Sequence, residues 1–413
     1  MLDLLKGVRV VSFNHFLLGP MGVQTLGDLG ADVISVESPQ GSWQRTWASG
    51  HVWADGQSAL HLCANRNKRS VAVDLKSARG QDIALRLIDS ADVVTENFRP
   101  GVMEKLGLGY TVLRRRKDGL IYASASGYGP DGPYADKPGQ DLLAQALFGM
   151  MAITGSAAGP RPVGASVIDH HGAALFAMGI LAALVRRQRT GQGCRVDASL
   201  MQAALDLQAE SLVAWSNAGE TRTIHAHRHV AGWYFPAPYG VYATKDGYLA
   251  LSLSPLGALA EALPAPELAR YSDEDGWRKQ DEIGELIATR LKARTTGEWI
   301  ARMEPLAIWH ARVQGYDEIL ADPQVRHMRA LITVQGAGAA RAPVTLVNHP
   351  VLYDGAAAAV RLPPQRLGAQ TREVLGEIGL DAGEIEALVR DAVIACDDTL
   401  VACDGSTTAG EGD

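Results

Sequence analysis

Strand and helix patterns alternate through the first third of the chain. The strand-like runs, rich in Val and Ile, are residues 8–13, 32–37, 70–74, 92–95 and 120–124. Helical spacing of apolar residues occurs between them, at 20–29 and 78–90. Strands separated by helices predict a parallel sheet, because each parallel connection has to cross over the sheet. The predicted fold class is α/β, with a doubly wound parallel sheet in a large domain.

The loops after the predicted strands are the expected position of a functional site. Ligands of such sheets bind beyond the carboxyl ends of the strands. Here those ends lead into the loops 14–19, 37–41 and 97–101. We therefore expect functional residues of the large domain in and around these three loops.

The middle of the chain has a different pattern. Residues 172–189 and 198–215 predict two long helices, and a strand at 248–253 begins a smaller α+β domain that reaches about residue 312. The apolar run 173–185 is too short to span a bilayer and is typical of a buried core helix. Residues from 397 onward are small and polar and predict a disordered tail.

The composition disfavours several classes of protein. The chain has 413 residues and a net charge of −7, and only 6% of the residues are aromatic, so no nucleic-acid surface is expected. Four cysteines are too few for a disulfide scaffold and indicate a reducing compartment. No secretory signal pattern occupies the first eleven residues. The predicted location is cytoplasmic, away from any membrane.

Common cofactor and nucleophile motifs are missing from the sequence. It has no Gly-x-x-x-x-Gly-Lys-Ser/Thr phosphate loop, no Gly-x-Gly-x-x-Gly turn after the first strand, no Gly-x-Ser-x-Gly elbow and no Cys-x-x-Cys pair. An NAD enzyme of the usual doubly wound type, a serine hydrolase and a cysteine-based zinc site are therefore not expected.

Two histidine clusters are candidate metal sites. In His225-Ala-His-Arg-His229 the three rings (His225, His227 and His229) would share one face of a strand, but a polar loop before the small domain explains the same residues. Asp169, His170 and His171 are adjacent in one loop, where side chains seldom converge on one ion. No metal site is predicted, and the role of the first cluster stays open.

Basic residues gather near the predicted strands. Asn65-Arg-Asn-Lys-Arg69 precedes the third strand, Lys76 follows it, and Arg99 and Lys105 flank the loop after the fourth. In an acidic protein this arrangement favours a phosphate-bearing small molecule, although scattered surface charge explains it equally well. The run Arg114–Lys117 ends a predicted helix, where positive charge suits the helix dipole.

Asp169 stands just ahead of the helix predicted from Gly172. As an N-cap, its side chain would accept a hydrogen bond from the first turn of that helix. As an anion stabilised by the helix dipole, it could instead act as a nucleophile in acyl transfer. The local pattern leaves both roles open.

A series of motifs runs through the first half of the chain. In order they are Gly7-Val-Arg-Val-Val11, Leu18-Gly-Pro20, Leu26-Gly-Asp-Leu-Gly-Ala-Asp-Val-Ile34, Asn65-Arg-Asn-Lys-Arg-Ser70, Asp74-Leu-Lys76, Asp92-Val-Val-Thr-Glu-Asn-Phe-Arg-Pro-Gly101, Ser126-Gly-Tyr-Gly-Pro130, Asp169 and Thr190-Gly-Gln-Gly193. This series closely resembles the family III CoA-transferases, densely over roughly residues 5–200 and more loosely beyond.

The resemblance implies a particular architecture. A large CoA-binding, Rossmann-like domain would take residues 1–215, and a small domain residues 225–315. A return segment, 320–395, would complete the large domain before a disordered tail at 397–413. The resemblance also implies an interlocked homodimer, in which two chains are linked like rings.

The resemblance further implies CoA transfer from an acyl-CoA donor to a small carboxylic acid. Asp169 corresponds to the family's nucleophilic aspartate, which carries aspartyl anhydride and aspartyl-CoA thioester intermediates. Asp141 matches an acidic position near the family's active site. The residues that match CoA-binding positions are His15, Val73, Lys76, Asn97, Phe98, Val102 and Lys105. CoA is then a substrate, with no tightly bound cofactor.

Several positions depart from the family's formyl-CoA transferase branch. Leu17 replaces a glutamine, Ser38 replaces an arginine for which Arg45 could substitute, and Ala231–Pro236 replaces a glycine-rich lid. One alternative is a 2-methylacyl-CoA racemase of the same family, which has a proton-exchanging histidine where this chain has Gln140. Another is a CoA-binding homologue without catalysis. The sequence specifies neither the donor nor the acceptor.

Overall fold

The computed structural model describes residues 3–156, 158–218 and 229–397. The chain divides into two compact units. The first comprises Met1–Gln140, Val167–Ala203 and Arg326–Asp413, and the second comprises Asp141–Ser166 and Ala204–Val325. Segments from the N-terminal and the C-terminal parts of the described chain therefore both contribute to the first unit.

A seven-stranded sheet forms the centre of the first unit, in the order β16-β5-β2-β1-β6-β7-β8. Its strands are β1 (Arg9–Phe13), β2 (Asp32–Glu37), β5 (Lys68–Val73), β6 (Val93–Glu96), β7 (Ile121–Ser126), β8 (Arg195–Ser199) and β16 (Ile394–Ala395). Neighbouring strands are parallel, except that β16 runs antiparallel to β5. The five strands predicted from the sequence are confirmed, as is the α/β fold class.

The region predicted as one helix over residues 198–215 is different in the structure. It contains the end of β8 and then two helices, α10 (Leu200–Leu207) and α11 (Ala209–Ser216). The strand escapes the sequence pattern because Ser199 is the only one of its five residues that is buried. An edge strand that buries so little surface leaves no apolar run to recognise.

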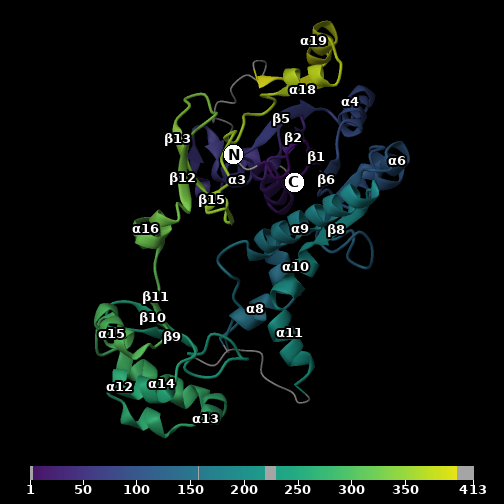
Figure 1. Ribbon diagram of the computed structural model, residues 1–413. Coiled ribbons are helices and arrows are strands. Elements are labelled where there is room, and N and C mark those ends of the chain that lie inside the picture. Colours follow the sequence, from purple (N-terminus) through teal and green to yellow (C-terminus); the bar gives the residue numbers. More distant parts are fainter. Residues whose placement is uncertain (1–2, 157, 219–228, 398–413) are drawn as a thin grey trace, which may run out of the picture. The chain divides into compact units, whose positions relative to one another are not determined.

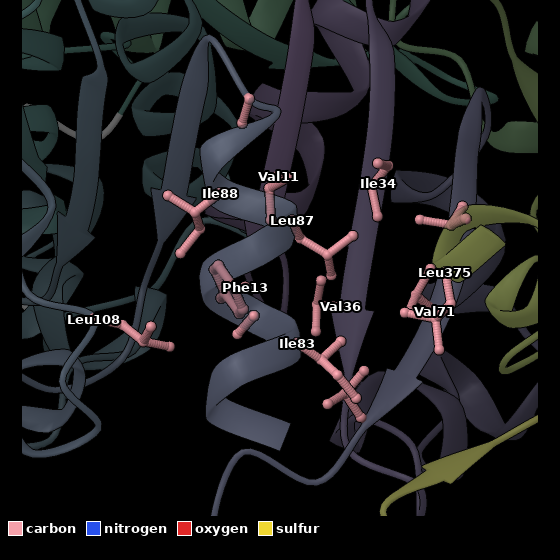
Figure 2. Close-up of a cluster of buried hydrophobic side chains, with 14 of the residues drawn as sticks. Val11, Phe13, Ile34, Val36, Val71, Ile83, Leu87, Ile88, Leu108 and Leu375 are labelled. Carbon is pink, nitrogen blue, oxygen red and sulfur yellow. The ribbon is translucent and has the colours of Figure 1, made fainter. Parts of the chain in front are cut away.

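One face of the sheet packs against α4 (Ala78–Asp89), whose apolar residues recur every three or four positions. Figure 2 shows the resulting core, in which α4 lies over alternate residues of the central strands. The labelled members of this core are Val11, Phe13, Ile34, Val36, Val71, Ile83, Leu87, Ile88, Leu108 and Leu375. Burial of each such side chain contributes ~1.5–3 kcal/mol, so a one-residue slip of any strand would be costly.

Two further helices of the first unit, α1 (Leu18–Asp28) and α9 (Val167–Thr190), pack closely together. A Cβ atom on Gly22 of α1 would lie 2.9 Å from the carbonyl oxygen of Ala173. A Cβ atom on Gly172 of α9 would lie 2.6 Å from Cδ1 of Leu18. The absence of side chains at these two glycines allows the helices to approach each other.

α9 is the one helix among the described residues that is long and apolar enough, by length and composition, to cross a membrane. Its buried side includes Phe176, Ala177 and Ile180, and the helix packs on α1, β7 and β8. A helix in the core of a protein can have the same length and apolar composition as a membrane-spanning helix. The contacts of α9 are those of a core helix.

The C-terminal part of the chain returns to the first unit. It supplies β12 (Leu331–Gln335), β13 (Pro343–Val347), α18 (Thr371–Glu377) and α19 (Ala382–Arg390) before β16. Figure 1 shows α18 and α19 in yellow near β5. Arg69 of β5 forms ion pairs with Glu373 at 3.0 Å and with Glu377 at 2.5 Å. These pairs, together with β16, attach the return segment to the sheet.

The second unit has its own core. Its antiparallel sheet consists of β9 (Gly240–Ala243), β10 (Tyr248–Leu251) and β11 (His310–Arg312). Its helices include α12 (Leu256–Ala262), α13 (Asp273–Arg278), α14 (Gln280–Leu291) and α15 (Thr296–Met303). Tyr242 and Leu249 of the sheet are buried in one cluster with Trp299 of α15. The smaller α+β part of the predicted fold class is thus confirmed.

The remaining elements are short. They are α2 (Trp43–Thr46), β3 (Trp53–Ala54), β4 (Gln57–Ser58), α3 (Ala59–Ala64), α5 (Val102–Lys105), α6 (Tyr110–Arg116), α7 (Asp141–Leu147), α8 (Met150–Thr154), α16 (Tyr316–Ala321), α17 (Pro323–His327), β14 (Leu352–Tyr353) and β15 (Ala356–Ala357), with three 3-10 turns at Ser49–His51, Pro266–Arg270 and Glu304–Leu306. The basic run after Leu113 forms the last turn of α6, as predicted.

The basic segment 65–69, whose last two residues begin β5, has a structural role. Nη2 of Arg66 donates to Oδ2 of Asp28 at 2.6 Å, and both side chains are buried. Asn67 and His349 also contact this carboxylate, at 2.7 and 3.1 Å. The ammonium of Lys68 donates to the carbonyl oxygen of Pro20 at 2.7 Å. The suggestion that residues 65–69 face a phosphate is therefore wrong, because they lie at the amino end of β5 and are used internally.

We expect Arg66→Met to lower the free energy of unfolding by about 3–5 kcal/mol, because it leaves the buried Asp28 carboxylate without its cation. Urea unfolding followed by circular dichroism measures the change. The double variant Asp28→Asn/Arg66→Met should recover part of the loss. Arg116→Met is the matched control, since its partner Asp89 is exposed and such pairs contribute ~1 kcal/mol or less. A loss below ~1 kcal/mol for Arg66→Met would contradict the prediction.

Candidate active site

The order of the strands changes direction between β1 and β6. β1 pairs with β2 on one side and with β6 on the other, and the sheet then continues outward through β5 and β7. Open α/β sheets bind ligands beyond the carboxyl ends of the two strands at such a switch point. We therefore expect a ligand-binding site at the loops that begin at Asn14 and at Asn97.

His15 and Asn97 connect these two loops directly. The N–H group of His15 donates to Oδ1 of Asn97 at 2.8 Å, and Nδ2 of Asn97 donates to the carbonyl oxygen of His15 at 2.7 Å. Nε2 of His15 also lies 3.3 Å from the carbonyl oxygen of Asn97. Burial lowers the pKa of His15, so its ring is neutral at pH 7. The structure thus brings two of the predicted CoA-contacting residues together.

An aromatic row extends from Phe98 through His15 to the surface. Ring centroids are 5.3 Å apart for Phe98 and His15, 4.6 Å for His15 and Phe16, and 4.9 Å for Phe16 and Trp43. Trp43 and Trp47 are stacked at 4.8 Å and remain 42% and 45% exposed. Sequence reasoning missed Phe16, Trp43 and Trp47. The rings are tilted by 41–57° along the row, and only Trp43 and Trp47 are stacked, so the exposed indoles at its end are the part that offers an apolar surface to an organic ligand.

Two predicted lysines follow strands of the same sheet. Lys76 follows β5, and Lys105 is the last residue of α5, the helix after β6. Both side chains are exposed, as is that of Arg99. Within the described residues, these three cationic groups have no carboxylate partner. Their charge is therefore available to an anionic ligand.

The two predicted valines differ in exposure. Val102 begins α5 and is half-buried, beside the Asn97 loop in sequence. Val73 is 0% exposed and belongs to the core under α4. Only main-chain atoms of Val73 could therefore contact a ligand.

Asp169 lies inside α9, because the helix begins at Val167. The expectation that Asp169 precedes the helix as its N-cap is therefore wrong. It occupies the first turn, where the helix dipole still favours a negative charge. Gly172, about one helical turn further along, contacts Leu18 at the start of α1. Since α1 begins directly after the His15 loop, the Asp169 turn lies on the carboxyl-end side of β1.

Asp141 belongs to the second unit, where it is the first residue of α7. Nε2 of Gln145, one turn later, donates to Oδ1 of Asp141 at 2.6 Å. Oε1 of Gln145 accepts from the N–H group of Val163 at 2.9 Å. The Asp141 carboxylate is thus oriented by a buried glutamine that also contacts the loop before α9.

Arg45 does not substitute for the arginine missing at Ser38. Its Nη2 and Nε donate to the buried carboxylate of Glu37 at 2.6 and 2.7 Å, and its Nη1 donates to the carbonyl oxygen of Gln365. Burial alone would raise the pKa of Glu37, but Arg45 outweighs it and holds this pKa at about 2. A guanidinium neutralised in this way is unavailable to a ligand.

Other residues considered as site residues lie in the second unit or outside the described part. His229 is 3.0 Å from Glu285, whereas His225 and His227 lie outside the described residues. In the part of the chain that the structure describes, no group of three His, Cys, Asp or Glu residues could hold a metal ion. In the aromatic segment 231–236, Trp233 donates to Oγ of Ser211 at 2.9 Å. That the segment 231–236 forms a lid over the active site stays a prediction.

The chain belongs to CoA-transferase family III, which it matches over residues 5–371. It is 34% identical over 406 residues to an acyl-CoA transferase of Fusarium pseudograminearum, covering 94% of this chain and 88% of the relative. It is 31% identical over 405 residues to the succinyl-CoA:glutarate CoA-transferase of Mus musculus, covering 94% and 90%. The chain is therefore a CoA-transferase by family, and the predicted enzyme class is confirmed.

Solved structures agree with this assignment. A CAIB/BAIF family protein from Brucella suis superimposes with a TM-score of 0.78 at 28% sequence identity, covering 90% of this chain and 98% of that protein. The resemblance deduced from the sequence motifs is thereby confirmed for the fold as well as for the family.

Proposed function

We propose that this enzyme transfers CoA from an acyl-CoA thioester to a carboxylic acid through covalent intermediates on Asp169. The observation that carries the proposal is the position of the Asp169 turn. It packs beside the start of α1, at the end of the sheet where His15 and Asn97 join the β1 and β6 loops. An anion at this helix start is stabilised by the dipole and is a suitable nucleophile.

In the proposed reaction, a carboxylate oxygen of Asp169 attacks the thioester carbonyl of the donor and CoA leaves as its thiolate. The thiolate then attacks the aspartyl carbonyl of the mixed anhydride, which releases the donor acid and leaves an aspartyl-CoA thioester. The acceptor carboxylate attacks this thioester and again expels the thiolate. Attack of the thiolate on the acceptor's acyl carbonyl forms the new acyl-CoA and regenerates Asp169. Exclusion of water protects both intermediates.

We propose that CoA is held by the seven residues predicted from the sequence, acting in different ways. His15 and Asn97 would fix the loops, Phe98 would supply an apolar contact, and Lys76 and Lys105 would offset phosphate charge. Val73 would act through its main chain, and Val102 through the start of α5. We propose Asp141 as a second catalytic residue, and no tightly bound cofactor is required.

We also propose that the enzyme is a cytoplasmic, interlocked homodimer. Exposed apolar residues on α10 and α11 support self-association, namely Leu205, Leu207, Leu212, Val213 and Trp215. Several exposed large apolar side chains on two consecutive helices are typical of a protein that associates through them. Sedimentation equilibrium tests the dimer, and a monomer at micromolar concentration would contradict it.

A matrix of donors and acceptors tests the function. The name of the mouse relative makes succinyl-CoA and glutarate the first pair to try, followed by acetyl-CoA and by acids of other length and polarity. We expect at least one pair to give a new acyl-CoA, detected by mass spectrometry, only when both substrates are present. Deuterium exchange into a 2-methylacyl-CoA without an acceptor would favour the racemase, although Gln140 offers no proton-exchanging group. Binding of CoA without either reaction would indicate an inactive homologue.

A further inference from the structure

Glu96 is a buried carboxyl group at the edge of the proposed CoA site. It is the last residue of β6, is 6% exposed, and pairs in register with Phe13 of β1 and Ser124 of β7. Its Oε2 accepts a hydrogen bond from the N–H group of Phe98 at 2.9 Å. The side chain therefore folds over its own strand end and holds the next turn of the chain.

The turn held by Glu96 is the one that carries Asn97. Asn97 makes the two short hydrogen bonds to His15 that join the loops of the switch point, and Phe98 begins the aromatic row. Loss of the hydrogen bond from Phe98 to Glu96 would leave a main-chain N–H group without its partner and free the turn to move. Glu96 is thus placed to control the conformation of two residues proposed to contact CoA.

The surroundings of Glu96 disfavour the ionised form of its carboxyl group. Burial raises the pKa of Glu96 to about 7, and the nearby carboxylate of Glu104 on α5 also raises it. Hydrogen bonds from Ser124 and Phe98 and the charge of Arg195 on β8 act in the opposite direction. Other titratable groups near this cluster are Tyr122 on β7, Asp197 on β8 and His15 after β1, whose ring centroid lies 5.3 Å from that of Phe98. At neutral pH the group is therefore balanced between its two protonation states.

We propose that Glu96 is a positioning residue of the CoA site that takes up a proton from solvent when CoA binds. This inference rests on the proposed function, because it requires CoA to bind at the switch point. The phosphates of CoA bring negative charge to the site, which disfavours an ionised carboxylate nearby. Reciprocally, a protonated Glu96 favours the bound state, since proton and ligand binding are linked.

The sign of the pH dependence follows from this linkage. If binding raises the pKa of Glu96 by ~1 unit from its value of about 7, affinity falls as the pH rises, by ~5-fold between pH 6 and pH 8. At pH 7 the wild-type enzyme should take up ~0.4 proton per ligand bound. Protonation keeps one carboxyl oxygen able to accept from Phe98, so the turn remains held.

Isothermal titration calorimetry with dephospho-CoA tests the proposal. This ligand lacks the phosphomonoester of CoA, which itself titrates near pH 6. Comparison of two buffers with different ionisation enthalpies gives the number of protons taken up. Glu96→Gln should bind with an affinity that varies less than ~2-fold from pH 6 to 8 and take up no proton. Asp118→Asn, at a carboxylate that is 90% exposed, is the matched control and should keep the wild-type profile.

A second variant covers the case in which Glu96→Gln does not fold. Ser124→Ala removes a hydrogen bond that favours the ionised carboxylate, so the midpoint of the wild-type pH profile should move to higher pH. Unchanged proton uptake in Glu96→Gln, or an unmoved midpoint in Ser124→Ala, would overturn the proposal for Glu96 alone. Failure of the wild-type enzyme to bind dephospho-CoA would overturn the proposed CoA site and this inference with it.

Discussion

Replacement of Asp169 by asparagine is expected to lower the rate of CoA transfer by ~10³-fold or more. The amide has nearly the same shape as the carboxylate but is uncharged and a much weaker nucleophile, so neither covalent intermediate can form. The first turn of α9 should be unchanged, because asparagine fits the same space. Initial rates measured with an active donor–acceptor pair, at saturating concentrations of both, give the comparison.

A matched control separates chemistry from helix stability. Asp273 is an exposed aspartate in the first turn of α13, so Asp273→Asn removes a similar dipole interaction, of ~0.3–1 kcal/mol, away from the proposed site. This control should retain wild-type activity. Hydroxylamine added during turnover should convert the wild-type aspartyl thioester into a hydroxamate at Asp169, located by peptide mass spectrometry. More than a tenth of the wild-type rate in Asp169→Asn, or a hydroxamate elsewhere, would refute the mechanism.

The five inner strands of the large sheet were predictable because burial on both faces demands nearly continuous apolar runs, whereas the edge strands β8 and β16 were not. The runs at 8–13 and 32–37 became β1 and β2 within a residue. The start of α9 was not predictable from the sequence, because Val167–His171 has no apolar periodicity and the regular pattern begins only at Gly172. That five-residue difference moves Asp169 from the cap into the first turn.

The basic segment before β5 illustrates a second limit of sequence patterns. Its cations stand close to a strand end in sequence, but a pattern does not reveal which end will face a ligand. Arg66 is neutralised by Asp28, and the same carboxylate contacts His349, which is 321 residues away. Internal pairing that depends on such distant segments becomes visible only in the folded chain.

The aromatic row is a third case. Phe98 and His15 followed from family motifs, whereas Trp43 and Trp47 lie in a segment that carries no motif. They join the row through Phe16, which has a φ of 61°, a value that a bulky residue seldom adopts. The N–H group of Phe16 donates to Oε1 of Gln44 at 3.1 Å, which supports this turn. No pattern of residue types predicts such a conformation.

Reversing the charge of both exposed lysines, in the double variant Lys76→Glu/Lys105→Glu, is expected to weaken CoA binding by ~100-fold at low salt. At a separation of ~5 Å in water, a unit charge and a phosphate attract by ~0.8 kcal/mol, and reversal converts this attraction into an equal repulsion. Two such changes amount to ~3 kcal/mol. Titration calorimetry with CoA at low ionic strength measures the loss.

The salt dependence of the same variant gives the sharper test, because screening acts on attraction and repulsion alike. Added salt should weaken CoA binding to the wild-type enzyme and strengthen binding to the double variant. Arg115→Glu/Arg189→Glu changes the net charge by the same amount at two exposed arginines on α6 and at the end of α9. It should bind CoA within ~3-fold of the wild type, since distant exposed charges are largely screened. Equal losses in the two double variants would mean that net charge, rather than the position of Lys76 and Lys105, attracts the phosphates.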